Sequence, residues 1–470
     1  MTCQRIVIVG GGISGLAAAH RLCELGRGQG RELEITLLEA KDRFGGVIST
    51  EVKDGFLLEG GPDCFLSEKP WALDLCRRLG LEEEVIETRR NFRQSFIYRK
   101  GKLVPVPQGF YLTVPSRMTA FLESDLFTWR GKLRMACEFF IPPRRHNGDE
   151  SIAGFVRRRF GREALERAAQ PMIAGIYTGD PEKLSLQATM PRFREMEHRY
   201  GSLIRAYRKS TQAVRENIES ASGPRYGLFL SLKAGMGSLV QTLIRGMPGV
   251  SLRTSASVAQ ISRAQNWIIS LKDGSVLEAD RLCLALPAPN AARLLNDVDP
   301  EIARALAGIS YESVAAVHCV FRKQDIPELK GFGFVVPARE NRKIVGCTFS
   351  AVKFAGRCPD DFFLIRAFVG GALHPGLFEL DDERMKRLVI EELRALLGIL
   401  SDPVLVSIAR HPESMPQYYV GHLERVRQIE HRAGQFPGLY LTGNAFRGIG
   451  IPDCIHAAER TAEKILHGLG

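Results

Sequence analysis

The chain has 470 residues, of which 25% are charged and 45% hydrophobic, proportions typical of a soluble globular protein. At roughly 150 residues per domain, this length predicts about three domains and excludes a small disulfide-stapled fold. Apolar runs stay shorter than the roughly 18 residues of a membrane-spanning helix. The N-terminus leads into a short strand rather than a secretory segment, so we expect a cytoplasmic protein.

Cysteine and histidine spacing argues against a metal centre. The ten cysteines form no Cys-x-x-Cys pair, and the ten histidines form no His-Glu-x-x-His motif. A zinc ribbon and a disulfide framework are therefore both disfavoured, and we expect no metal ligands.

The positive charge is concentrated in one stretch. The net charge is +11, and the residues from Arg89 to Gln170 include 17 basic and 7 acidic side chains. Such a stretch suits nucleic acid, an anionic membrane or a polyanionic substrate, and also an arginine-rich solvated helical surface. Charge alone leaves these alternatives open.

The first elements predict a nucleotide-binding unit. A β-branched strand over 5–9 is followed by a glycine loop, a helix over 16–25 and a strand over 33–38 that ends on Glu39. The glycine spacing lets the backbone approach a pyrophosphate, and Glu39 is placed to bind a ribose. The loop residues assigned to the dinucleotide are Gly10, Gly11, Gly12, Ile13, Ser14 and Gly15.

Further along, helix and sheet signals alternate. Residues 66–88 are expected to be helical, and 266–277 form a hairpin around Asp273-Gly274. A buried strand follows over 281–286, and the apolar runs at 314–321, 332–336 and 362–368 indicate a second, antiparallel sheet. The C-terminus predicts a strand over 439–441, a glycine loop, and a helix from about Asp453 to Leu466 that Asp453 would cap.

Two segments favour FAD over NAD as the dinucleotide. The stretch 39–46, with Ala40, Gly45 and Gly46, resembles the second fingerprint of flavin amine-oxidase-like proteins, in which paired glycines pass beside the extended cofactor. The segment from Thr442 through Gly443 and Asn444 to the C-terminal helix would set a helix N-terminus against the flavin, where its dipole favours negative charge.

Four motifs resemble those of the oxygen-dependent protoporphyrinogen and coproporphyrinogen oxidases, and the likeness covers nearly the whole chain. They lie at 59–65, 171–185, 233–239 and 447–455. The resemblance implies an α/β protein with an interrupted Rossmann-like FAD-binding domain (1–70, 225–295 and 431–470), an antiparallel-sheet substrate domain (296–430), a helical segment at the substrate site (71–88) and a helical membrane-docking domain (89–205).

The resemblance also implies site residues. Lys69 would face a substrate propionate, Gly175 would lie beside the macrocycle, and His411 stands where many relatives carry tryptophan. Cys64 and Cys454 are interpreted as packed residues rather than nucleophiles, and His318 as a core histidine whose polar atoms are satisfied by hydrogen bonds. No catalytic side chain is assigned. The residues implied to line the cofactor are Gly61, Pro62, Asp63, Cys64, Val258, Asn444, Ile449, Gly450 and Ile451.

The implied activity is FAD-dependent oxidation of coproporphyrinogen III, protoporphyrinogen IX or both in haem biosynthesis, with oxygen as acceptor and peroxide as by-product. The implied partners are an anionic membrane surface, ferrochelatase and a second copy of the chain. The alternatives are a carotenoid desaturase or an amine oxidase, which the motifs at 171–185 and 447–455 disfavour, and a nucleotide-binding scaffold for nucleic acid. The aromatic residues of the basic stretch lie among leucines and prolines rather than forming a stacking platform, so no nucleic acid is expected.

Overall fold

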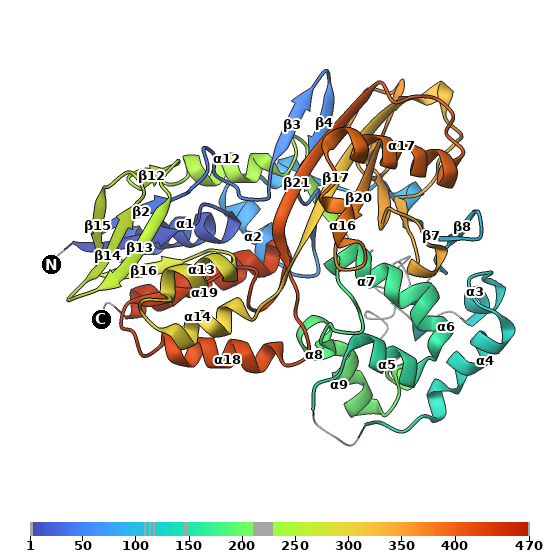
Figure 1. The fold of residues 1–470 in the computed structure, drawn as a ribbon, viewed down its shortest axis with the longest axis horizontal. Helices are drawn as coiled ribbons and strands as arrows, with labels where there is room; N and C mark the ends of the chain where they lie inside the picture. Colours follow the sequence, from blue (N-terminus) through green and yellow to red (C-terminus); the bar gives the residue numbers. More distant parts are fainter. Residues whose placement is uncertain are drawn as a thin grey trace.

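The computed structural model describes residues 3–107, 110–111, 114–115, 118–144, 148–209 and 229–468. Figure 1 shows a parallel sheet with its helices on one side of the molecule and a long, twisted sheet on the other, with a helical unit below the latter. The expected start of the second FAD-binding segment, at 225, lies outside the described residues.

The parallel sheet has five strands in the order β12-β2-β1-β16-β22. Strand β1 (Gln4–Val9) is central because its apolar side chains are buried on both faces, between β2 (Leu33–Leu38) and β16 (Arg281–Leu284). The outer strands are β12 (Ser251–Arg253) and β22 (Leu439–Leu441). The expected strand, glycine loop, helix and strand are confirmed, although the helix α1 (Ile13–Gly28) is longer than predicted.

Helices and a small antiparallel sheet cover the parallel sheet. Helix α19 (Ile451–His467) packs beside α1, and α12 (Gly237–Arg245) joins the same core. The predicted hairpin is confirmed as β14 (Trp267–Leu271) and β15 (Val276–Ala279), which form a three-stranded sheet with β13 (Val258–Arg263). Helices α13 (Ala288–Leu295), α14 (Pro300–Ala307) and α18 (His422–Ala433) close this side.

The second sheet has seven strands in the order β21-β17-β20-β19-β18-β7-β8. All its neighbouring pairs are antiparallel except β18 with β7, so the expected antiparallel sheet is confirmed. Helix α17 (Asp382–Leu397) packs on one face with the short α16 (Pro375–Phe378), as Figure 1 shows. The strands are β7 (Ser95–Arg99), β8 (Lys102–Pro105), β17 (Tyr311–Arg322), β18 (Gly333–Val335), β19 (Gly346–Phe349), β20 (Phe362–Gly370) and β21 (Leu405–Pro416).

Two sequence expectations fail in this region. The segment 71–88 is α-helical only in α2 (Trp71–Arg78), because Gly80 with φ +70° ends it, and a single 3₁₀ turn follows at Glu82–Glu84. Val85–Glu87 (β6) then joins β5 (Phe65–Leu66) and β11 (Phe229–Leu232) in a small sheet. Strands β7 and β8 belong to the seven-stranded sheet, so the first part of 89–205 is not helical.

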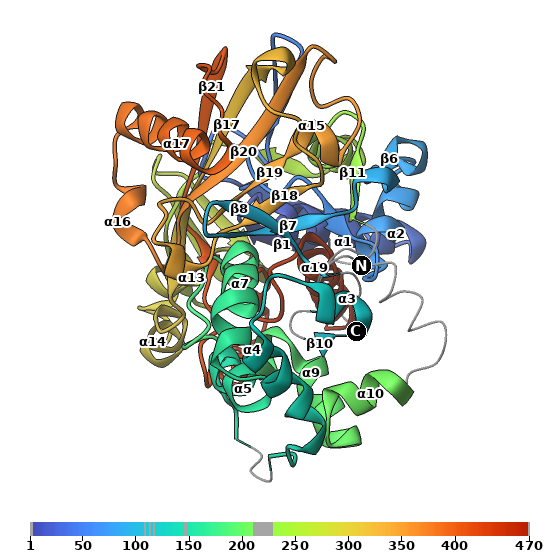
Figure 2. The same cartoon turned by 90° about the vertical axis from the view of Figure 1, so that its right-hand side faces the viewer.

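The helical unit lies below the seven-stranded sheet (Figure 2). Its core is held by Arg159 and Glu138, a fully buried ion pair, and Glu138 also accepts hydrogen bonds from the first residues of α10. Its helices are α3 (Met118–Glu123), α4 (Trp129–Ala136), α5 (Ile152–Arg159), α6 (Arg162–Ala164), α7 (Gln170–Tyr177), α8 (Leu186–Thr189), α9 (Pro191–Tyr200) and α10 (Leu203–Lys209).

Many arginines of the basic stretch are ion-paired within this unit. Arg158 binds Glu150 and Glu197, and Arg167 binds Glu163. The charge excess is therefore partly neutralised within the fold rather than presented as one basic face. Among the described helices, none has the length and apolar character needed to span a membrane.

Candidate active site

The first glycine loop leaves open space at the carboxyl end of β1. A Cβ atom on Gly12 would meet no atom within 4 Å, whereas one on Gly15 would lie 1.9 Å from the carbonyl oxygen of Gly10. Gly15 therefore lets α1 pack against the strand end, and Gly12 faces the space where a ligand can approach the backbone. The Oε2 atom of Glu39 accepts a hydrogen bond of 2.8 Å from the N–H of Gly11, at the edge of the same space.

The second glycine pair is joined to the first loop. The N–H of Gly45 donates to the carbonyl of Gly11 at 2.8 Å, and Gly45 and Gly46 have φ values of +108° and +59°. A Cβ on Gly46 would lie 3.2 Å from the Cα of Gly12, so only a glycine passes here without displacing the loop. The glycine loop at 10–15 and the segment 39–46 thus form one groove.

The predicted adenine-side residues lie at the end of this groove. The N–H of Ala256 donates to the carbonyl of Glu39, and the N–H of Ser255 donates to that of Lys41. These bonds fasten the segment that leads into β13, which begins at Val258, to the segment around the exposed Ala40. The structure therefore gathers residues from 10–15, 39–46 and 256–258.

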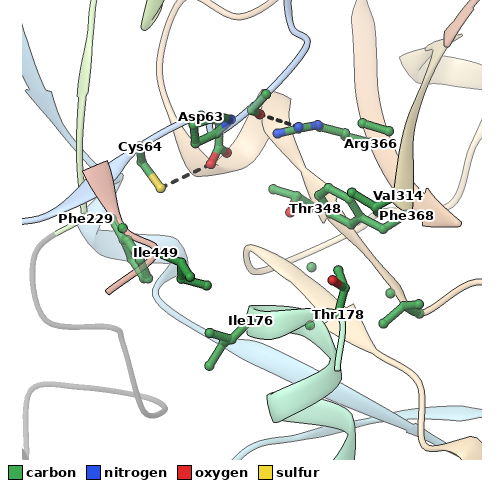
Figure 3. A pocket seen from close by; sticks show the side chains of 18 of the residues that line it. Asp63, Cys64, Ile176, Thr178, Phe229, Val314, Thr348, Arg366, Phe368 and Ile449 are labelled. Carbon is green, nitrogen blue, oxygen red and sulfur yellow. Dashed lines mark hydrogen bonds between the residues drawn. The ribbon is translucent and has the colours of Figure 1, made fainter. Parts of the chain in front are cut away.

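A cavity of about 440 Å³ lies between the parallel sheet, the seven-stranded sheet and α7. Figure 3 shows Asp63 and Cys64 on one wall, with Arg366, Thr348, Phe368 and Val314 on another and Ile176 and Thr178 on the helical side. The predicted site residues that line it are Gly61, Pro62, Asp63, Cys64, Lys69, Gly175, Asn444, Ile449, Gly450 and Ile451. Gly443 precedes this lining at the end of β22, with φ +132°.

The N-terminus of α19 faces this cavity through Gly450, Ile451 and Pro452. Tyr418 holds the loop before it, because its hydroxyl accepts from the N–H of Gly448 at 2.9 Å and donates to the carbonyl of Asn444. The expected cap is wrong: Gly450 occupies the cap position, and the Asp453 side chain does not cap the helix.

Asp453 instead binds Lys69. The ammonium of Lys69 lies 2.6 and 2.7 Å from the two carboxylate oxygens, and the lysine side chain is 41% exposed. Lys69 does line the cavity, as expected, but its charge is already balanced by a carboxylate that the sequence did not associate with it.

A second ion pair lies deeper in the cavity wall. Lys353, in the short helix α15 (Ser350–Lys353), donates to both oxygens of Asp63 at 3.0 and 2.9 Å and to the sulfur of Cys64 at 3.2 Å. Burial opposes ionisation of both groups, but Lys353 and Arg366 hold the pKa of Asp63 below its usual range, and Asp63 holds the pKa of Lys353 above its own. Asp63 and Lys353 are therefore both charged at neutral pH.

The cysteines of the site are protonated. Burial and the neighbouring Asp63 raise the pKa of Cys64 to about 12, although Lys353 is the basic partner that the sequence did not reveal. Burial likewise raises the pKa of Cys454 to about 12. Neither thiol is a thiolate nucleophile at neutral pH.

Two histidines lie near the cavity. Burial, with Arg366 nearby, lowers the pKa of His318 to about 3, so this core ring is neutral. The prediction that its polar atoms are satisfied is wrong, because neither ring nitrogen has a hydrogen-bond partner among the described residues. His411 lines the cavity, and its Nε2 lies 2.7 Å from the carbonyl oxygen of Gly60 and therefore donates to it. Burial lowers the pKa of His411 also, so both rings are neutral.

Comparison with known proteins identifies the family. The flavin-containing amine oxidoreductase family matches residues 13–466. The chain belongs to this family. It is 34% identical to a coproporphyrinogen III oxidase of Bacillus subtilis, over 98% of each chain, and 30% identical to a chloroplastic protoporphyrinogen oxidase 1 of Spinacia oleracea, over 98% of this chain and 84% of the other.

Solved structures of flavin-containing amine oxidoreductases and related proteins share the fold. A proposed protoporphyrinogen oxidase from Exiguobacterium sp. 255-15 superposes with a TM-score of 0.87 at 33% identity, covering 99% of both chains. A UDP-galactopyranose mutase gives a TM-score of 0.74 at 18% identity, covering 99% of this chain and 96% of the other, and supports the fold only. The resemblance to porphyrinogen oxidases inferred from the motifs is confirmed.

The described residues fit the flavin that this family carries. The backbone is open to a ligand at Gly12, the adjoining Gly45 and Gly46 lead to Val47 in the cavity lining, and the N-terminus of α19 lies in the same lining, so these segments fit a bound flavin. Among the described residues, no cluster of three or more histidine, cysteine or acidic side chains is placed to hold a metal ion.

Proposed function

We propose that this chain is an FAD-dependent oxidase that converts a porphyrinogen into a porphyrin in haem biosynthesis. The observation that carries the proposal is the cavity: its largely apolar walls meet the segments 61–64 and 449–451, which fit a flavin ring, and its volume lies in the range of sites for cofactors and small molecules. The curated relatives named coproporphyrinogen III oxidase and protoporphyrinogen oxidase support the same conclusion.

In this proposal the glycine groove binds the pyrophosphate of FAD, and Glu39 binds its ribose. Ala40 and Val258 lie at the adenine end, while Asp63, Cys64 and Ile449 flank the ring. The bound flavin supplies a hydride acceptor. The chain's own task is to orient the macrocycle and exclude water, because aromatisation of the porphyrin already drives the reaction forward.

Substrate contacts come from the seven-stranded sheet and α7. Phe368, Val335 and Ala316 provide the apolar wall, and Gly175 on α7 adjoins this wall, because a Cβ on it would lie 3.0 Å from a methyl carbon of Val335. We propose coproporphyrinogen III as the preferred substrate, because relatives with 34% and 35% identity bear that enzyme name. Oxygen is the proposed electron acceptor, and peroxide the by-product.

Anaerobic mixing of the holoenzyme with each porphyrinogen tests the function. Loss of the visible absorbance of oxidised flavin is expected for coproporphyrinogen III and more weakly for protoporphyrinogen IX. Because one flavin accepts only two electrons and the full oxidation needs repeated two-electron steps, porphyrin fluorescence should follow when oxygen is admitted. Admission of oxygen should restore the flavin absorbance and yield peroxide. A flavin-containing protein whose spectrum neither substrate changes would refute the proposal.

We also propose peripheral association with an anionic membrane from the cytoplasmic side. Exposed apolar side chains lie on α4 and the 3₁₀ turn after it. Trp129 and Leu133, one helical turn apart on α4, are 71% and 69% exposed, Phe140 in the 3₁₀ turn is 78% exposed, and the exposed Arg130 is next to Trp129 in the sequence. Aromatic and leucine side chains next to cations suit a lipid interface, where insertion and charge attraction add. Ferrochelatase and a second copy of the chain stay predicted partners.

Flotation with anionic liposomes tests these exposed side chains. The double variant Trp129→Ser and Leu133→Ser should lose most co-flotation, because each exposed side chain contributes about 1–2 kcal/mol of insertion. Leu400→Ser is the matched control, since Leu400 is 85% exposed but lies in the loop after α17. Equal flotation of parent and double variant would refute the role of these side chains.

A further inference from the structure

The ionisable side chains that line the cavity leave one cation without a carboxylate partner. Lys69 is paired with Asp453, and Lys353 is paired with Asp63. The third cation of the lining, Arg366, forms no ion pair with any residue that the structure describes. The cavity wall therefore carries one uncompensated positive charge.

Arg366 is held rigidly at the wall. Its side chain is 5% exposed, and its Nη2 donates to the carbonyl oxygens of Gly60, at 3.3 Å, and Gly61. The guanidinium lies 4.9 Å from the ring centroid of Phe368, which also lines the cavity. Within the described part of the chain, its buried Nε has no hydrogen-bond partner. A guanidinium with five donors that satisfies only two carbonyls retains capacity for an anion.

The nearest carboxylates are engaged elsewhere. Asp63 accepts from Lys353, and Glu59 accepts from the Thr50 hydroxyl at 2.6 Å and the Met236 N–H at 2.8 Å. Burial lowers the pKa of Arg366 even though Asp63 and Glu59 act in the opposite direction. An unpaired buried cation is costly, so a ligand that supplies a negative charge would recover much of this cost.

The sheet places further polar groups beside Arg366. Arg366 on β20 lies in a row of directly paired residues that crosses four neighbouring strands. The other members of the row are Thr348 on β19, Gly333 on β18 and Ser95 on β7. Directly paired residues share a face of the sheet, and all four line the cavity. Figure 3 shows Thr348 beside Phe368, close to Arg366.

The next row on this face is apolar. Two residues along the strands, Ala316, Phe368, Gly346 and Val335 pair across β17, β20, β19 and β18 and also line the cavity. One face of the sheet therefore presents a cation and a hydroxyl beside a broad apolar strip. This pattern matches a ligand with an apolar body edged by a carboxylate.

We propose that Arg366 and Thr348 form a carboxylate-binding subsite that receives one propionate of the porphyrinogen. The inference rests on the proposed function and deepens it, because it assigns substrate recognition to the sheet wall. Lys69 then acts as a second cation that the substrate reaches only in competition with Asp453.

Binding of the porphyrin product to the holoenzyme tests the subsite. Coproporphyrin III and its tetramethyl ester have the same macrocycle, but only the acid carries carboxylates, and quenching of their fluorescence reports the Kd. Arg366→Gln should weaken binding of the acid at least about tenfold and leave the ester unchanged. Arg366→Lys should restore part of the loss, and Thr348→Val should give a smaller, acid-specific loss.

Arg357→Gln is the matched control. Arg357 is a buried arginine that bonds to the carbonyls of Lys233 and Leu232 and to the Ser231 hydroxyl, outside the cavity lining. Its variant reports the cost of losing a buried guanidinium and should bind acid and ester as the parent does. If Arg366→Gln does not fold, the Kd values of Thr348→Val for the acid and the ester test the subsite instead.

Three outcomes would overturn the subsite. The first is that the parent, Arg366→Gln and Thr348→Val bind the acid with the same Kd. The second is that the variants lose affinity for the acid and the ester equally. The third is that Arg366→Gln lowers the flavin midpoint potential but leaves porphyrin binding unchanged, which would assign the cation to the reduced flavin instead. Failure of the parent to oxidise porphyrinogen while it still binds the acid through Arg366 would refute the function and leave the subsite standing.

Discussion

Substitution of the first-loop glycines should separate cofactor binding from folding. Gly12 has φ −71° and ψ −179°, a conformation that any residue adopts, and a Cβ there meets no protein atom within 4 Å. Gly12→Val should therefore cost the apoprotein no more than about 1 kcal/mol, chiefly through the poorer helix cap. Because the side chain would occupy the cofactor's approach to the backbone, flavin binding should be lost.

Gly15→Val should act through the protein itself. Its Cβ would lie 1.9 Å from the Gly10 carbonyl oxygen and 3.3 Å from Leu37, against an ordinary contact of 3.4 Å or more. Relieving the overlap requires α1 to move by more than an ångström from the strand end, and overpacking of this kind costs about 1–3 kcal/mol or more. The apoprotein itself should be destabilised.

Two measurements distinguish these variants. The Tm of the flavin-free proteins should fall clearly for Gly15→Val and little for Gly12→Val. Added FAD at a hundredfold excess over its Kd should stabilise the parent by about 2.7 kcal/mol and Gly12→Val not at all. Stoichiometric flavin in purified Gly12→Val, or an unchanged Tm for flavin-free Gly15→Val, would refute the reasoning.

Other side chains of the site yield three further expectations. Asp453→Asn should lower the KM for coproporphyrinogen by releasing Lys69, and Lys69→Ala should raise it by up to about fivefold with an unchanged flavin spectrum; identical KM values would remove Lys69 from the substrate site. Lys353→Met should destabilise the apoprotein at pH 7 by about 3 kcal/mol. Since the pKa of Asp63 is depressed and that of Lys353 raised, this difference should shrink below about pH 4 and above about pH 10.5 in unfolding titrations; a pH-independent difference would contradict the ion pair. Tyr418→Phe should weaken FAD binding about tenfold, as measured by flavin release, because two hydrogen bonds to the loop before α19 are lost.

The sequence predicted those parts of the fold whose signals are local. The glycine loop, the hairpin at Asp273-Gly274 and the long apolar strands of the second sheet each depend on nearby residues, and each was found where expected. The segment 71–88 failed because Gly80 ended the helix early and β6 paired with the distant β11. Pairing between strands that are far apart in the sequence gives no local hydrophobic periodicity from which it could be predicted.

The candidate site shows the same division. Its glycine motifs could be predicted from the sequence, but its ion pairs could not. Lys353 and Asp63 are 290 residues apart in the sequence, and Asp453 and Lys69 are 384 residues apart. Arg366 lay within an apolar run and gave no signal of its own. Only the register of β19 and β20 shows that it adjoins Thr348.

The order of strands in the parallel sheet has a consequence for biosynthesis. Strand β1 is synthesised long before its sheet is completed by β16 and then by β22, and α1 packs against α19, which follows β22 in the sequence. The parallel sheet and the core around α1 can therefore be completed only after β22 and α19 have been synthesised. A nascent chain arrested before Leu439 would lack β22 and α19 and would expose the apolar face of α1 that packs against α19.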